Sequence, residues 1–223
     1  MSLSEFVYRY FNFNTICEVL TIFGFCYFIV RTFILKKPPV PSSGNRKVTK
    51  ELLEKCLNLL KKQDKGSYGI YQVPYEILVQ LQADLHNEAA LKRLLCSICD
   101  HYGINGEYIR LVTEARRETE YAGNIATNGA FTTIKLELKP GYTLDAVIAI
   151  LAHEAAHLHL FYKGIRLKND WENEILTDTA TVYYGFGEYM YKGYSVLRGE
   201  FAFTYQKVGY ISQEDVKYIM SLL

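Results

Sequence analysis

The residues with the clearest chemical potential lie between positions 150 and 159, which read Ile-Leu-Ala-His-Glu-Ala-Ala-His-Leu-His. His153 and His157 are four residues apart, so on a helix both imidazoles project from one face and can reach one Zn²⁺ at about 2.0–2.1 Å. Glu154 is one step round the helix from His153, close enough to take a proton from a water that completes the metal's shell. We therefore expect Zn²⁺ as cofactor, two histidine ligands, and Glu154 as the general base for hydrolysis of peptide bonds.

The segment that carries this motif is predicted to be a buried helix from Thr143 to Tyr162. Its side chains are apolar on nearly every face, which is typical of a helix in the core of a domain. Thr143 is suited to cap the N-terminus of this helix. Burial of two histidines and a glutamate in an apolar helix is costly unless something pairs them, and a bound cation does so.

A catalytic zinc needs a third protein ligand and an open fourth position, and the candidates for the third ligand lie downstream. Asn169 or Asp170 can cap a second helix, which is predicted to continue to about Tyr184. On that helix, Glu174 and Asp178 are four residues apart on one face. One carboxylate can then bind the metal while the other accepts the free N–H of a ligand histidine. Glu172 remains an alternative ligand.

With these residues the sequence resembles the gluzincin clan of zinc metallopeptidases, whose pattern is His-Glu-x-x-His followed by Glu-x-x-x-Asp on a separate helix. The resemblance covers roughly residues 130–187 and implies an α+β, zincin-like domain. It implies five site residues: His153, His157 and Glu174 as metal ligands, Glu154 as general base, and Asp178 as the residue that orients a ligand histidine.

The resemblance also implies where a substrate binds. Clan members pair the substrate backbone with an edge strand that precedes the active-site helix, and the β-forming residues 131–138 are placed for that role. We therefore expect Ile134, Lys135 and Leu136 to bind a peptide or protein substrate. Larger clan members stabilise the transition state with a later Tyr or His, and the candidates here are Tyr183, Tyr184, Tyr189, Tyr194 and Tyr205.

The remaining predicted elements form a scaffold around this site. Two amphipathic helices are predicted, Thr49–Lys62 and Asn87–His101, and a small mixed sheet includes a strand over residues 108–113. Gly185-Phe-Gly187 is predicted to end the second ligand-bearing helix. His159 projects from nearly the opposite face to the ligand histidines, so we expect a structural role for it.

The N-terminal residues 1–37 differ from the rest in composition. Residues 16–35 are almost uncharged and just long enough to span a bilayer, which predicts an N-terminal hydrophobic helix that anchors the chain in a membrane. Residues 38–48 are rich in proline and cannot continue a helix, so they are predicted to be a linker. The metallopeptidase domain is expected over residues 49–223.

Charge predicts the orientation of this anchor. The flank after it carries Lys36, Lys37, Arg46 and Lys47, whereas the flank before it carries Arg9 against Glu5. By the positive-inside tendency, the catalytic domain should face the cytoplasm. The odd number of cysteines, 5, implies no disulfide framework and agrees with a reducing compartment.

Composition and motif leave two alternatives. The 25 Lys and Arg balance 24 Asp and Glu, and this net charge of +1 gives no global field to hold nucleic acid, so a nucleic-acid partner is not expected. One alternative function is a non-catalytic, membrane-anchored zinc-binding or sensor module. The other is a regulatory metallopeptidase of the type that cleaves bacterial repressors.

Overall fold

The computed structural model of the chain describes residues 48–64, 66, 68–114, 123–127, 132–138, 141–193, 196–198, 203–205 and 209–223. The chain divides into two units, Met1–Ser42 and Ser43–Leu223, and all of the described residues belong to the second unit. The predicted anchor at residues 16–35 and nearly all of the predicted linker lie outside the described residues, so they stay predictions.

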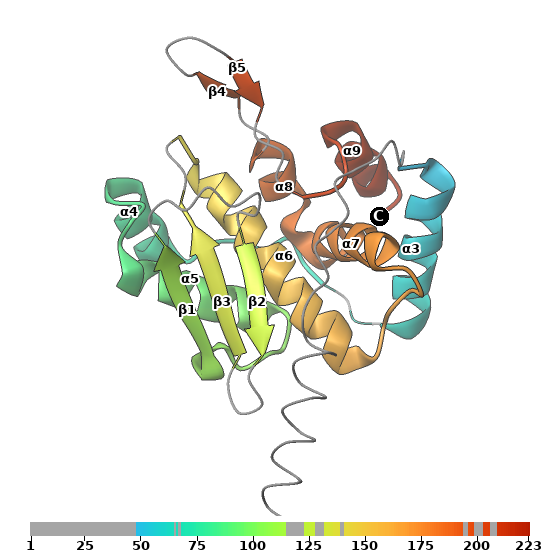
Figure 1. Cartoon of the computed structure of the whole chain (residues 1–223), viewed down its shortest axis with the longest axis horizontal. Coiled ribbons are helices and arrows are strands. Elements are labelled where there is room, and N and C mark those ends of the chain that lie inside the picture. The colour runs from blue at the N-terminus through green and yellow to red at the C-terminus, as the bar shows by residue number, and fades with distance from the viewer. Residues whose placement is uncertain are drawn as a thin grey trace, which may run out of the picture. The chain divides into compact units, whose positions relative to one another are not determined.

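Helices pack around a small sheet in the second unit (Figure 1). This confirms the predicted α+β class. In chain order the described elements are α3 (Lys50–Gln63), α4 (Tyr75–Ala83), α5 (Glu88–His101), the 3₁₀ turn η1 (Gly106–Tyr108), β1 (Ile109–Glu114), β2 (Gly123–Thr127), β3 (Thr132–Glu137), α6 (Leu144–Lys163), α7 (Asp170–Thr181), the π-helical turn η2 (Val182–Phe186), α8 (Gly187–Gly193), β4 (Val196–Arg198), β5 (Phe203–Tyr205) and α9 (Gln213–Ser221).

Local capping signals place the starts of three helices where the sequence predicts them. The hydroxyl of Thr49 accepts from a backbone N–H at the start of α3, and the side chain of Asn87 does the same for α5. Thr143 caps α6 by accepting from the N–H of Ala146. Each side chain satisfies a donor that the first helical turn leaves without a partner, which fixes where the helix begins.

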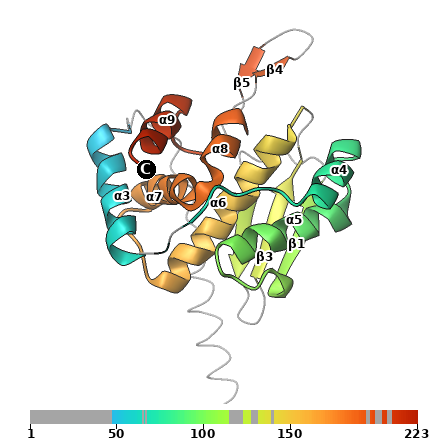
Figure 2. The ribbon, with the colours of Figure 1, turned by 180° about the vertical axis from the view of Figure 1, so that it is seen from behind.

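Helix α6 is the central element of the unit. The sheet and α5 contact α6 on one side, whereas α7 and α8 contact it elsewhere on its surface (Figures 1 and 2). Among the described residues α6 is also the helix that is long and apolar enough to cross a membrane, but 78% of its apolar window is buried in the protein. Its apolar surface therefore serves as core, as the sequence predicts.

The sheet is mixed, as predicted, and its strand order is β1-β3-β2. β1 runs parallel to β3, and β2 runs antiparallel to β3, so that Ile134 lies opposite both Leu111 and Ile125. Ile134 and Leu136 are fully buried, whereas Lys135 between them is exposed on the other face. This alternation is the expected result of one sheet face packing on helices.

The prediction that residues 131–138 form an edge strand is wrong. β3 is the middle strand, so its main chain is hydrogen-bonded to β1 on one side and to β2 on the other. Pairing of a substrate backbone with Ile134, Lys135 and Leu136 would require one of these neighbours to leave the sheet. The error arises because β2 pairs with β3 from the far side, and strand order is a tertiary property that alternation within one strand does not encode.

The prediction that Gly185-Phe-Gly187 ends the second helix is confirmed at Gly185, which adopts a non-helical, left-handed conformation with a φ of 94°. Another helix begins directly afterwards, so the chain runs from α7 through η2 into α8 across a kink at this glycine. A Cβ at Gly185 would collide with the carbonyl oxygen of Gly69, and the N–H of Tyr71 donates to the Gly185 carbonyl at 3.1 Å. The glycine therefore permits the segment at residues 69–71 to cross the helix at close range.

Candidate metal centre

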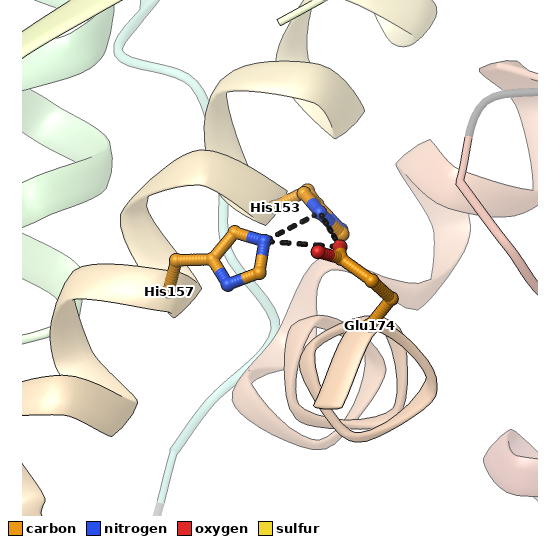
Figure 3. A group of neighbouring side chains, drawn as sticks. All are labelled: His153, His157 and Glu174. Atoms are coloured by element: carbon orange, nitrogen blue, oxygen red, sulfur yellow. Dashed lines mark hydrogen bonds and ion pairs between the residues drawn. The ribbon is translucent and has the colours of Figure 1, made fainter. Parts of the chain in front are cut away.

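Three side chains from two helices converge on one point. His153 and His157 project from α6 toward Glu174 on α7 (Figure 3). The two Nε2 atoms lie 3.0 Å apart, and Glu174 Oε2 lies 3.4 Å from Nε2 of His153 and 3.2 Å from Nε2 of His157. His153, His157 and Glu174 thus form a largely buried group that could hold a metal ion.

The second nitrogen of each imidazole is held by a residue of α7. Nδ1 of His153 donates to Asp178 Oδ1 at 2.7 Å. Nδ1 of His157 lies 3.2 Å from Thr177 Oγ1, whose own proton is donated to the carbonyl of Asn173 at 2.8 Å. The hydroxyl can therefore only accept from the imidazole, so both rings carry their proton on Nδ1 and direct an Nε2 lone pair inward.

This arrangement fits a metal ion better than it fits a hydrogen-bond network. When both rings are neutral, with the proton on Nδ1, two lone pairs and a carboxylate oxygen face one another with no donor among them, and only a metal ion or an added proton can satisfy them. Ligand atoms around a tetrahedral ion at about 2.0–2.1 Å are separated by roughly 3.3 Å, which matches the three observed separations of 3.0, 3.2 and 3.4 Å. The donor set, two imidazole nitrogens and one carboxylate oxygen, leaves a fourth position open.

The local electrostatics favour a positive charge at the same point. Burial alone would lower the pKa of His153, but the carboxylates of Asp178, Glu174 and Glu154 outweigh burial and raise it to about 10. Burial opposes the ionisation of Glu174, yet the two imidazoles hold the pKa of its carboxyl well below the ordinary value. A divalent cation satisfies this field while leaving the ligands free of protons.

Asp178 connects the centre to the C-terminal part of the chain. Its side chain is fully buried, and besides His153 it accepts hydrogen bonds from the backbone N–H groups of Tyr210 and Ile211. Gly209, at a φ of 90°, approaches so closely that a Cβ there would lie 2.8 Å from Asp178 Oδ1. The carboxylate that orients a ligand histidine is itself fixed by three donors, which restricts the direction of the imidazole.

Glu154 directly follows His153 on α6 and is buried. Only 4% of the residue is exposed, and its Oε2 has no hydrogen-bond partner among the described residues. A buried carboxylate oxygen without a partner is unusual, because the loss of hydration is then not repaid. The arrangement leaves this oxygen able to accept a proton.

The other predicted site residues occupy different places. The carboxylate of Glu172 pairs with Lys55 at 3.1 Å, so the group takes Glu174 and not Glu172. The hydroxyls of Tyr183 and Tyr184 donate to the backbone and side chain of Asp64, away from the group. The ring of Tyr189 packs near Tyr71. Tyr194 and the side chain of Tyr205 lie outside the described part of the chain.

Tyr210 is the residue that sequence reasoning missed. Its ring stacks on that of His153, with centroids 6.1 Å apart and an interplanar angle of 28°. The ring is half-buried and directly follows Gly209, the close contact of Asp178. No local motif marks Tyr210, because it reaches the centre only through the hydrogen bonds that Asp178 accepts. The one sequence signal is the glycine before it.

His159 lies on the other side of α6 and contacts a different carboxylate. Its Nε2 lies 2.8 Å from Asp64 Oδ2, and its Nδ1 lies 2.9 Å from the carbonyl oxygen of Tyr102. The same Asp64 oxygen also accepts the hydroxyls of Tyr68 and Tyr184. His159 is therefore part of a buried polar cluster remote from the metal centre, which agrees with its predicted structural role.

No protein-family model, curated protein or solved structure matches this chain. The class of site is therefore defined by the geometry alone: a centre on two helices, with two histidines and a glutamate that could hold a metal ion.

Proposed function

We propose that this chain is a zinc-dependent metallopeptidase with a zincin-like fold, in which His153, His157 and Glu174 hold the metal and Glu154 is the general base. The observation that carries the proposal is the buried Oε2 of Glu154, which has no partner among the described residues and lies one residue from a ligand histidine. A structural metal site has no use for such a group, whereas hydrolysis requires a proton acceptor near the open metal position.

Bound zinc would lower the pKa of a water ligand to about 7 and polarise the carbonyl of the peptide bond. The residues of the chain supply the remaining functions. Glu154 takes the proton from the water and delivers it to the leaving amine. Asp178 and Thr177 keep the Nε2 lone pairs of the histidines directed at the metal through their hydrogen bonds to Nδ1.

Tyr210 replaces the earlier tyrosine candidates as a residue beside the reaction centre. Its ring stacks on that of His153, which supports Tyr210 as a candidate to contact a bound substrate. For substrate binding, β2 is the described edge strand that contacts α6, and a peptide in extended form would bind along it. The membrane anchor at residues 16–35 and the cytoplasmic orientation complete the proposal, and both rest on the sequence.

The experiment that tests the catalytic proposal is the substitution Glu154→Gln in the full chain. The variant should keep its zinc, because the three ligands persist, while cleavage of casein or a peptide library falls by at least about a hundredfold through loss of proton transfer. Glu172→Gln is the matched control, since its carboxylate pairs with Lys55 on the surface, and it should retain activity. Full activity of Glu154→Gln would refute the role of the base.

A second comparison separates an enzyme from a zinc-binding module without activity. The native chain should cleave the substrates, lose activity with a chelator and regain it when zinc is restored. Stoichiometric zinc without cleavage of any substrate, in a chain that remains folded, would favour the non-catalytic module.

A further inference from the structure

The C-terminal end of α6 and the turn that follows it expose aromatic and basic side chains together. We call residues 161–168 the α6 tip; they read Phe-Tyr-Lys-Gly-Ile-Arg-Leu-Lys and include three cations and no acidic residue. Phe161 is 76% exposed and Tyr162 is 63% exposed. The α6 tip is thus apolar and positively charged at once, and the catalytic proposal uses none of its residues.

The exposed rings sit on a well-fixed turn. Gly164 ends α6 in the left-handed conformation, at a φ of 66°, and its N–H donates to the carbonyl of Phe161 at 3.1 Å. Ile165 is buried, and the side-chain amide of Asn173 bonds both the N–H and the carbonyl of Leu167, at 2.6 and 3.0 Å. This is a helix end closed by a glycine cap. The exposure of the rings is therefore a property of the folded tip and not of a fraying end.

The charges on the α6 tip are available to a partner. Lys163 forms an ion pair with Asp64, with Nζ 3.7 Å from Oδ1, whereas Arg166 and Lys168 are exposed and make no ion pair with the described residues. Cations beside exposed aromatic rings fit the interface of a membrane with anionic lipids, where rings enter the headgroup level and long basic side chains reach phosphates.

We propose that the α6 tip docks on the surface of an anionic lipid bilayer, with Phe161 and Tyr162 in the interface and Arg166 and Lys168 on the headgroups. This inference is independent of the proposed catalytic function.

Two other exposed tyrosines among the described residues lack this combination. Tyr108 is 73% exposed and follows Glu107, and Tyr75 is 78% exposed and precedes Glu76. An acidic neighbour repels anionic headgroups, so neither tyrosine fits a lipid surface as the α6 tip does. Tyr108, the last residue of η1, is therefore a matched control position for the α6 tip.

The test places a single fluorescent reporter on the full chain. Trp171 is the one tryptophan of the sequence, so Trp171→Phe gives a silent background. Phe161→Trp in this background reports on the α6 tip, and Tyr108→Trp reports on the control position. Both variants are mixed with vesicles of phosphatidylcholine and phosphatidylserine that carry brominated acyl chains, which quench tryptophan only within the bilayer. The readout is local, so it is valid whether or not residues 16–35 anchor the chain.

We expect strong quenching for Phe161→Trp and several-fold weaker quenching for Tyr108→Trp, with the difference lost in vesicles of phosphatidylcholine alone. Arg166→Gln with Lys168→Gln should reduce docking about fivefold per removed charge, whereas Arg110→Gln, an exposed cation on β1, should not. Equal quenching at both positions, or none at position 161, would overturn the proposal. An unquenched reporter at position 161 would instead indicate that the α6 tip contacts a protein partner and not a bilayer.

Discussion

Two histidines of α6, only two residues apart, are used in different ways. His157 directs Nε2 at His153 and Glu174, and its Nδ1 is held by a hydroxyl. His159 points the other way, and both of its nitrogens face oxygen atoms of the protein, one on Asp64 and one on Tyr102. In both histidines a carboxylate oxygen lies close to Nε2, so proximity to an acidic residue does not distinguish the two sites.

The difference lies in the partners of the two ring nitrogens. In His159, Nδ1 faces the Tyr102 carbonyl and Nε2 faces Asp64, so both nitrogens are held by oxygen atoms of the protein. In His157, Nδ1 is held by Thr177, whereas Nε2 faces His153 and Glu174, the other members of the group that could hold a metal ion. A histidine with one nitrogen held and the other directed at further ligand atoms is suited to a metal, whereas a histidine with both nitrogens held is suited to a structural role.

The largest expected effect contrasts His157→Ala with His159→Ala. The zinc affinity of His157→Ala should fall by more than ~100-fold, because this variant lacks a ligand. Loss of a residue that only supports a ligand costs up to ~100-fold. His159→Ala should keep the metal, because the ring of His159 makes no contact with His153, His157 or Glu174. Zinc affinity measured by competition with a chromophoric chelator checks the pair. Similar zinc loss in both variants would contradict the separation of the two faces.

In the absence of metal, the unfolding free energy should fall more for His159→Ala than for His157→Ala. His159→Ala leaves the buried carboxylate of Asp64 without its imidazole hydrogen bond, and loss of a hydrogen bond to a buried charged group costs about 1.5–3 kcal/mol of unfolding free energy. His157 is partly exposed and its loss should cost less. Urea unfolding of both variants in the presence of chelator measures the difference. If His157→Ala proved the less stable of the two, His159 would not have the structural role described above.

The two buried aspartates give the next contrast. Asp178→Asn should weaken zinc binding about 10–100-fold, because Asp178 orients His153 and raises its basicity. Asp64→Asn should leave zinc affinity unchanged. Isothermal titration with zinc tests this, with circular dichroism to verify that each variant is folded. Unaltered affinity in Asp178→Asn would show that the hydrogen bond to His153 has no influence on the metal.

The smallest expected effect is on the stability of the folded chain at acidic pH. Burial raises the pKa of Asp64, but hydrogen bonds from His159, Tyr68 and Tyr184 outweigh it and bring the pKa from 3.8 down to about 2. The unfolded chain therefore binds this proton more readily, so the stabilisation is complete above about pH 4 and is lost as the pH falls toward 2.

Asp64→Asn should remove at most about 2 kcal/mol of pH-dependent stability over this interval. Urea unfolding at pH 5 and pH 2.5 measures it, and Asp84→Asn, an exposed carboxylate, is the control. The same loss of stability in acid for wild type and Asp64→Asn would show that Asp64 does not cause it.

The predictable part of this molecule is the part encoded within single elements. The i,i+4 pairs His153/His157 and Glu174/Asp178 specify faces of two helices, and the three groups of the metal cluster meet once those faces pack. The N-caps at Thr49, Asn87 and Thr143 depend on neighbouring residues alone, and the sequence predicts all three.

The wrong predictions depend on contacts between distant segments. β3 is an inner strand because β2 pairs with its far side. The sequence predicts the break at Gly185, but not that residues 69–71 cross the helix there. Tyr183 and Tyr184 face Asp64, 119 and 120 positions away along the chain. Helical periodicity indicates that such residues share a face with others, but it does not say which other segment that face will meet.

The central claim is that His153, His157 and Glu174 bind zinc, and the most direct measurement is elemental analysis of the purified full chain, prepared without chelators. The account predicts about one zinc per chain, retained in His159→Ala and lost in His157→Ala. Absence of any bound metal from folded protein, after dialysis against zinc and removal of the excess, would contradict the claim. So would stoichiometric zinc that survives removal of both His153 and His157.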